Sequence, residues 1–269
     1  MLIFYILFFI FGTIIGSFLN VVIARLKTKE SILKDRSHCP FCKKKLSWYE
    51  LVPIASFLIQ KGRCKKCKKK ISWQYPLVEL TTGLIFLLAI FNFSPYGGPA
   101  VGWQFPGIIN ILFLLIISSF LIIIFVYDLK HYLVPDEIIY PAIVLTFIYF
   151  LFRIWNFGNW NLFVIWNLLF GALLGGAFFL IIVLVSRGRW MGMGDVKIGV
   201  LMGLLLGLPQ VFVAIFLAFL IGAFISIILL LLKKKKLKSE IPFAPFLVGA
   251  TFVVFLWGDI LIKWYLNLF

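Results

Sequence analysis

Two aspartates lie where long apolar segments begin or end. Asp128 follows the apolar run over residues 108–127, and Asp195 precedes another run within the stretch Gly192-Met193-Gly194-Asp195. An acid at the edge of a membrane segment is costly and therefore points to a function. Two carboxylates that meet in a low-dielectric site cannot both ionise easily, so the pair can act as general base and general acid around a water. This pattern favours peptide hydrolysis by an aspartic dyad, with a chance aspartate in an interfacial loop as the alternative.

The residues around Asp195 refine this expectation. Gly192 and Gly194 carry no side chains, which we expect to let the backbone of a substrate approach the carboxylate. Lys197 follows two residues later, where it either tunes the site or anchors the chain at the membrane interface.

Asp136 is the alternative to Asp128 as the partner of Asp195. It follows Pro135 and precedes an apolar segment over residues 137–152, and Asp is favoured as a helix cap at such a place. We therefore expect Asp128, which directly follows its apolar segment, to be the catalytic partner.

The four cysteines form two CxxC pairs, Cys39/Cys42 and Cys64/Cys67, which are separated by 21 residues. Each pair can place two thiolates on one ion, and two pairs complete a closed tetrahedral zinc site of the structural kind. Disulfides are the alternative, but they are disfavoured on the inner side of a cell membrane.

The composition indicates an all-α polytopic membrane protein. Of the 269 residues, 63% are hydrophobic and only 13% are charged, and apolar runs of membrane-spanning length recur along the chain. The sequence predicts about eight transmembrane helices, over residues 2–22, 76–93, 108–127, 137–152, 162–185, 196–206, 211–232 and 245–265. We expect a single membrane domain over 1–269, with no internal repeat.

The basic residues set the orientation. Fifteen Lys and Arg lie in residues 25–75, and the eight-helix arrangement puts 24 of the 26 basic residues on one side. By the positive-inside rule this side is cytoplasmic, so both termini lie outside and both aspartates face the cytoplasm. The net charge of +16 therefore indicates loops at a membrane and no nucleic-acid partner. Residues 25–75 are expected to form a cytoplasmic zinc-binding insert, whose lysines either lie near anionic lipid headgroups or are simply solvated.

Six short motifs, taken in order, resemble those of the type IV prepilin peptidases, a family of integral membrane aspartic proteases with a GxGD signature. They cover almost the whole chain: Gly16-Ser17-Phe18-Leu19-Asn20-Val21-Val22, Cys39-Pro40-x-Cys42, Gly62-Arg63-Cys64-x-x-Cys67, Tyr75-Pro76-Leu77-Val78-Glu79, Asp128 with Val134-Pro135-Asp136, and Gly192-x-Gly194-Asp195.

This resemblance implies cleavage of the basic leader from prepilins or pseudopilins at the cytoplasmic membrane face, with Asp128 and Asp195 as the catalytic pair. The long cysteine loop implies that the new N-terminal residue is also methylated with S-adenosylmethionine. Glu79 and Trp48 are the candidate residues for this methyl donor, although no glycine-rich nucleotide fingerprint is present. The basic insert would not attract a basic leader, and the sequence does not explain this mismatch.

A membrane transporter is the alternative from another class, because paired intramembrane acids also serve as cation or proton sites. Transporters often show inverted repeats and sites at the midplane of the bilayer. Both features are missing from the predicted arrangement, which therefore favours the peptidase.

Overall fold

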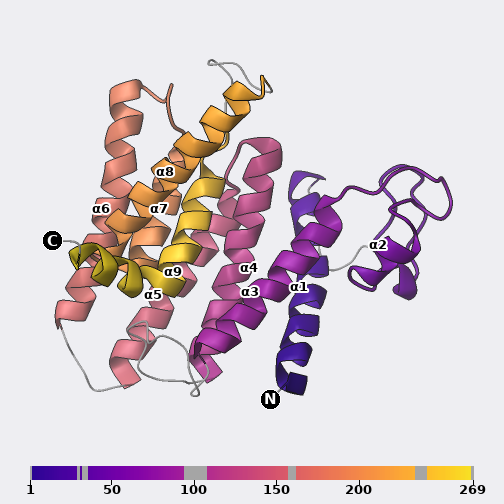
Figure 1. Ribbon diagram of the computed structural model, residues 1–269, viewed down its shortest axis with the longest axis horizontal. Coiled ribbons are helices and arrows are strands. Elements are labelled where there is room, and N and C mark those ends of the chain that lie inside the picture. Colours follow the sequence, from indigo (N-terminus) through magenta and orange to yellow (C-terminus); the bar gives the residue numbers. More distant parts are fainter. Residues whose placement is uncertain are drawn as a thin grey trace. The chain divides into compact units, whose positions relative to one another are not determined.

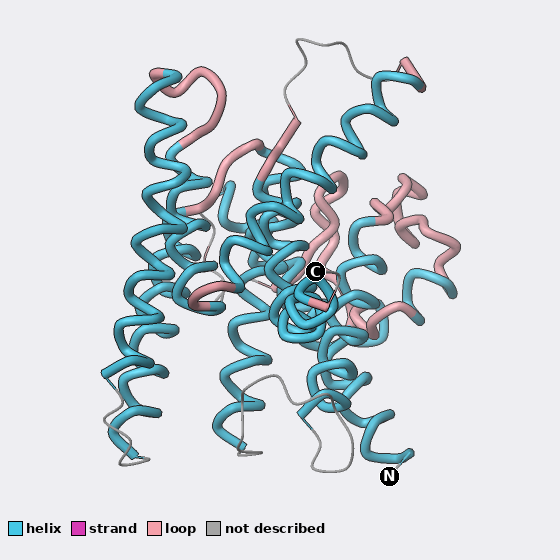
Figure 2. Tube along the Cα trace, turned by 60° about the vertical axis from the view of Figure 1, so that its left-hand side comes forward, coloured by secondary structure: helices cyan, strands magenta, loops and turns pink. Residues whose placement is uncertain are grey.

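The structure is a computed structural model that describes residues 2–28, 31, 36–93, 108–156, 162–233 and 241–267. Helices are the only extended regular elements in these ranges, which confirms the predicted all-α fold (Figures 1 and 2). In chain order they are α1 (Leu2–Thr28), the short 3-10 helix η1 (Trp48–Glu50), α2 (Ala55–Ile59), α3 (Gln74–Phe93), α4 (Ile108–His131), α5 (Asp136–Asn156), α6 (Leu162–Ser186), α7 (Met193–Leu206), α8 (Gln210–Leu231) and α9 (Ala244–Leu266).

The eight predicted membrane helices correspond to α1 and α3–α9, but their lengths differ from the prediction. Six of them are long and apolar enough to cross a membrane: α1, α3, α4, α6, α8 and α9. The helix α7 has 14 residues and is about 21 Å long at 1.5 Å per residue, which is less than the ~30 Å of a hydrocarbon core. It therefore reaches only part of the way across.

The chain divides into two compact units, the first covering residues 1–98 and 105–123. In this unit α1 packs along α3, and glycines permit the contact. A Cβ on Gly16 would lie 2.7 Å from Cα of Glu79, and one on Gly12 would lie 2.8 Å from Cα of Gly83. The small-xxx-small spacing of α1 thus brings its backbone against the face of α3 that carries Glu79.

The second unit contains residues 124–269 and holds both candidate aspartates. Its helices α6 and α7 pack with their backbones in contact. A Cβ on Gly199 would lie 2.5 Å from the carbonyl oxygen of Gly175, and one on Gly171 would lie 2.7 Å from that of Gly203. Such close approach is what stabilises helix pairs in lipid, where hydrophobic burial alone gives no advantage. The contact fixes α7 against α6.

The turn after α7 is held by a side chain from α6. Asn167 accepts a hydrogen bond from the backbone N–H of Leu208 at 2.6 Å and donates one to its carbonyl oxygen at 3.0 Å. Gly207, at φ 67°, permits the turn. This amide satisfies backbone groups that would otherwise be unpaired in an apolar setting, so the short helix α7 ends at a defined place.

Candidate functional site

Asp128 is buried in the last turn of α4, with 5% of its surface exposed. The backbone N–H of Ala244, the first residue of α9, donates a hydrogen bond to its carboxylate. A helix N-terminus carries unpaired N–H groups and a partial positive charge, so it is a favourable neighbour for an anion. Sequence reasoning missed Ala244, although Pro242 and Pro245 on either side of it mark a helix start.

Asp195 lies in the first turn of α7, three residues after the N-cap Gly192. The backbone N–H of Gly192 faces its carboxylate, as in the half of a capping box in which an acid at the third position reaches back to the cap. The carboxylate also experiences the electrostatic repulsion of Asp128. The structure therefore brings the two predicted aspartates, which are 67 positions apart, into one electrostatic environment within the second unit.

The two glycines before Asp195 have different roles. A Cβ on Gly194 would lie 2.7 Å from Cγ2 of Val134, so this glycine makes room for the connection between α4 and α5. Gly192 has no such neighbour, and the only atom near its added Cβ would be the nitrogen of Gly194 at 3.9 Å. The space beside Gly192 is therefore open, whereas the side of Gly194 is filled by Val134. That a substrate backbone approaches the acid here stays a prediction.

Lys197 joins α7 to the start of α5. Its ammonium group lies 2.5 Å from the carboxylate of Asp136 and 4.8 Å from the ring centre of Tyr140. Asp136 is the first residue of α5 and its side chain is 58% exposed, in contrast to the buried Asp128. An acid in the first turn is favoured by the helix dipole. Asp136 and Lys197 thus hold the two helix starts together, a positioning role that the sequence did not reveal.

The four cysteines come together in the insert between α1 and α3. Their sulfur atoms all lie within 4.8 Å of one another, and those of Cys39 and Cys67 are 3.9 Å apart. Tetrahedral zinc with bonds of about 2.3 Å requires sulfurs about 3.8 Å apart. All four are free thiols and not disulfides. The donor set and its spacing therefore fit a structural zinc ion.

The insert contains a short duplication that the sequence analysis overlooked. The pattern Cys-x-x-Cys-Lys-Lys-Lys, followed by Leu or Ile, Ser and Trp, occurs at 39–48 and again at 64–73. The hydrogen bonds repeat as well, from Cys39 N–H to the Lys44 carbonyl and from Cys64 N–H to the Lys69 carbonyl. The lysine after each second cysteine has positive φ, 56° at Lys43 and 58° at Lys68. We call these two segments the knuckles.

Polar and cation–π contacts tie the knuckles together. Glu50 is buried and accepts hydrogen bonds from Ser47 N–H at 2.9 Å and from the Lys44 ammonium. The Ser47 N–H, assisted by Lys44, holds the pKa of Glu50 below its ordinary value despite burial. Lys65 of the second knuckle lies 4.5 Å from the ring centre of Tyr49. Lys69 of the second knuckle lies equally close to Phe41 of the first knuckle.

One thiol of the cluster is prepared for ionisation. The backbone N–H groups of Cys67 and Lys66 donate to the sulfur of Cys64 and lower its pKa to about 6. A metal binds the thiolate form, so these two N–H groups favour at Cys64 the charge state that zinc requires.

The two residues predicted for a methyl donor lie in the first unit, in different surroundings. Glu79 is 7% exposed, and its carboxylate accepts hydrogen bonds from Ile54 N–H at 2.7 Å and from Ser17. Among the described residues no Lys or Arg pairs with it. Trp48 is 79% exposed and its ring contacts that of Tyr49. The structure therefore contains a buried carboxyl group with neutral hydrogen-bond donors and a separate exposed ring.

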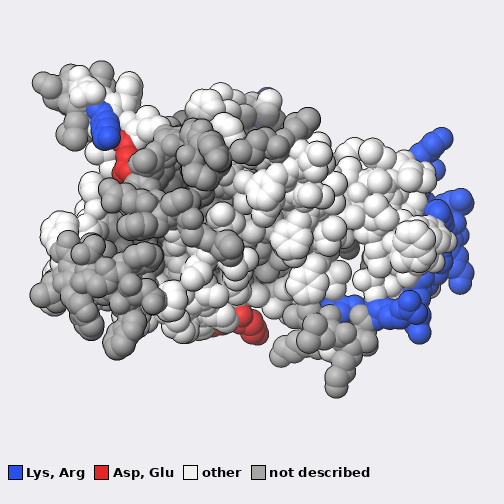
Figure 3. Space-filling model, turned by 90° about the horizontal axis from the view of Figure 1, so that it is seen from below, with Lys and Arg blue, Asp and Glu red and all other residues white. Residues whose placement is uncertain are grey.

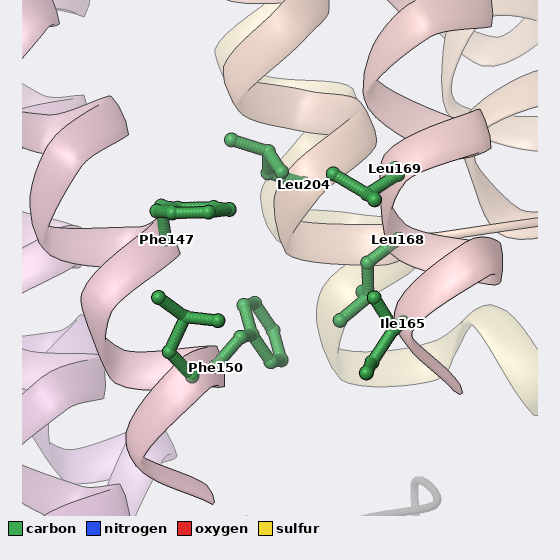
Figure 4. A pocket seen from close by; sticks show the side chains of 7 residues that line it. Phe147, Phe150, Ile165, Leu168, Leu169 and Leu204 are labelled. Carbon is green, nitrogen blue, oxygen red and sulfur yellow. The ribbon is translucent and has the colours of Figure 1, made fainter. Parts of the chain in front are cut away.

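An apolar crevice lies between α5, α6 and α7 (Figure 4). Its lining residues are Phe147, Phe150, Leu151, Ile165, Leu168, Leu169 and Leu204. Leu204 is nine residues from Asp195, or about 13 Å along the α7 axis. With no polar group in its lining, the crevice supplies no chemistry to the aspartates.

Comparison with known proteins gives two matching family models. The Bacterial Peptidase A24 N-terminal domain matches residues 10–93, and the Type IV leader peptidase family matches residues 113–227. A prepilin leader peptidase/N-methyltransferase from Bacillus subtilis is 32% identical over 97% of each chain. Proteins of the same name from Xanthomonas campestris and Aeromonas hydrophila are 31% and 30% identical, over 95% and 98% of this chain and 92% and 94% of their own. No solved structure was found to match.

The contact between Gly194 and Val134 can be tested by paired substitutions. Gly194→Ala should lower the midpoint of thermal unfolding in detergent, because the new methyl group overlaps Val134 and overpacking costs about 1–3 kcal/mol. Adding Val134→Ala should restore much of the loss by removing the overlapping methyl group. Gly249→Ala, where a Cβ meets no atom within 4 Å, serves as the control. A double variant no more stable than Gly194→Ala would contradict the contact.

Proposed function

We propose that the chain, which belongs to the type IV leader peptidase family, removes the basic leader from prepilins or pseudopilins. Asp128 and Asp195 would form the catalytic pair, and the new N-terminus would then be N-methylated. The names of its relatives support a peptidase with methyltransferase activity. They give no support to the transporter alternative.

One observation carries the catalytic assignment. Asp128 and Asp195 come from different helices, and their negative charges repel each other. The state in which the pair shares one proton is therefore favoured over the state in which both carboxylates are ionised. The ionised carboxylate would take a proton from a water, whose oxygen attacks the scissile carbonyl carbon. The protonated carboxyl would then give its proton to the leaving amine as the C–N bond breaks.

We further propose that this pair faces the cytoplasm and that both chain termini lie outside. The support is the distribution of charge, with 24 of 26 basic residues on the side that carries Asp128 and Asp195. A prepilin would present its basic leader at this surface and its apolar helix to the membrane. The negative aspartate pair is then the attractive partner for the leader.

We assign a structural zinc ion to Cys39, Cys42, Cys64 and Cys67. The fit of the sulfur positions supports it, and a closed set of four thiolates leaves no open position for catalysis. The ion would supply the cross-link between the two knuckles, whose exposed lysines give them little apolar core.

For the methyl donor we propose Glu79 as the ionic contact. S-adenosylmethionine carries a sulfonium and an ammonium charge, and Glu79 is a buried carboxylate that has only neutral hydrogen-bond donors recorded around it. A cationic ligand would offset the cost of that buried charge. The stacking role of Trp48 stays a prediction: its ring is exposed and is therefore accessible to a ligand or substrate.

The catalytic pair is tested by removing one charge at a time. Asp128→Asn and Asp195→Asn should each slow leader cleavage of a co-expressed prepilin by at least about a hundredfold, because an amide cannot exchange the proton. Asp136→Asn is the matched control: its amide oxygen can still accept a hydrogen bond from Lys197 and so keep α7 in place, and cleavage, measured by mass spectrometry of the product, should persist. Loss of cleavage in Asp136→Asn together with its survival in Asp128→Asn would transfer the role to Asp136.

The metal is tested by substituting one knuckle. Cys64→Ser with Cys67→Ser should abolish bound zinc in elemental analysis and speed hydrogen exchange across residues 36–73, because the cross-link is lost. His38→Ala, beside Cys39, should keep its zinc, since no histidine belongs to the cluster. Unchanged zinc content in the cysteine variant would refute the assignment.

Glu79→Gln separates the two activities. The amide oxygen can still accept the Ile54 hydrogen bond, so the fold and leader cleavage should persist, while loss of the charge should reduce methylation of the cleaved product by about tenfold or more. Glu137→Gln, at the exposed start of α5, should change neither activity. Normal methylation in Glu79→Gln would remove this residue from the donor site.

A further inference from the structure

We propose that α2 and Trp73 form a membrane-docking surface that enters the headgroup region of an anionic leaflet beside the ends of α1 and α3. The surface is defined by Leu58, Ile59 and Trp73. It rests on the membrane-spanning character of α1 and α3, and it does not depend on peptidase activity.

The depth of α2 is set by a hydrogen bond to a membrane helix. Ile54 immediately precedes α2, and its N–H donates to the carboxylate of Glu79 at 2.7 Å. Glu79 lies five residues inside α3, or about 7.5 Å along its axis, within a span apolar enough to cross a membrane. Ser17 of α1 also donates to this carboxylate, so the backbone of α2 begins beside both membrane helices.

The anchoring backbone has an unusual conformation. Ile54 has φ 58° and ψ −53°, and the N–H of Ala55 donates to the carbonyl oxygen of Pro53 at 2.5 Å. This tight turn is strained for a β-branched residue. The Ile54 N–H that donates to the buried carboxylate of Glu79 holds this turn, so the chain enters α2 at a fixed place and direction.

The side chains that α2 presents are apolar and exposed. Leu58 and Ile59 are 64% and 76% exposed, and Trp73 is 68% exposed. The buried ring of Phe57 contacts the ring of Trp73, with ring centres 5.0 Å apart, and this contact joins α2 and Trp73 into one surface. Large apolar groups gathered beside a membrane helix are costly in water, and Trp is favoured at the interface of a bilayer.

The charges beside this surface identify the partner as anionic lipid. Lys61, Arg63 and Lys70 are exposed and lie within three residues of Ile59, Trp73 or each other in the chain. Figure 3 shows a group of Lys and Arg side chains at the right-hand end of the view, the end at which Figure 1 labels α2. Phosphate-bearing headgroups complement them, as they do other basic segments next to membrane spans. A basic prepilin leader would instead be repelled.

Depth measurements on the full chain test the surface. Leu58→Cys, labelled with a nitroxide in nanodiscs containing phosphatidylglycerol, should report oxygen access and exclusion of an aqueous nickel chelate, at a depth of about 5–10 Å expected for an interfacial element. Lys66→Cys, exposed on a knuckle, is the matched control and should remain open to nickel. The unsubstituted chain measures background labelling of the four native cysteines.

Changes of lipid composition and addition of a prepilin distinguish docking on anionic lipid from the absence of docking and from binding of a protein. In pure phosphatidylcholine the label at position 58 should move toward water, and an equal depth in both lipids would refute the anionic partner. Nickel access at position 58 equal to that at position 66 would refute docking itself. Shielding that appears only when a prepilin is added would show a protein-binding surface instead. None of these readouts requires cleavage, so they are independent of the catalytic assignment.

Discussion

The backbone contact between α6 and α7 is the constraint on which the candidate active site depends. Asp195 sits at the start of a helix too short to cross a membrane, so span length does not fix its depth. The close approach of Gly199 to Gly175 fixes it instead, and the Asn167 clamp defines where α7 ends. At its other end, Lys197 and Asp136 hold α7 to α5. Only with α7 fixed in this way can its carboxylate face Asp128 reproducibly, as a proton-sharing pair requires.

The sequence was enough to predict the helices and the pairing of acids, because long apolar runs and rare carboxylates are strong local signals. It could not predict partners made through space. Nothing near Ala244 in the chain indicates that its N–H meets Asp128, and nothing near Lys197 indicates Asp136. Gly194 was expected to make room for a substrate, whereas in the structure it makes room for Val134, because a glycine in a sequence does not show which neighbour it accommodates.

The duplicated knuckles show the opposite case, a signal present in the sequence that went unused. The ten residues at 39–48 and those at 64–73 share their cysteine, lysine, serine and tryptophan positions. Each knuckle provides two cysteine ligands, so one local fold used twice supplies the four ligands of a closed zinc site. Lys44, Lys65 and Lys69 have contacts within the insert, whereas exposed lysines such as Lys61 and Lys70 are available for contacts outside it.

Contact of the exposed lysines with lipid headgroups would explain why a basic insert occurs in a protein that is expected to bind a basic leader. If the insert had evolved to attract the leader, its lysines would have the wrong sign, whereas contact with anionic headgroups gives them the right one. The aspartate pair lies in the second unit and the lysines in the first, so the two charge patterns belong to different parts of the chain. Lysines that neutralise lipid headgroups also repel a leader less, because their field is screened by their own counter-charges. A basic surface and an acidic site can therefore serve one membrane-bound substrate, provided that each charge faces its own partner.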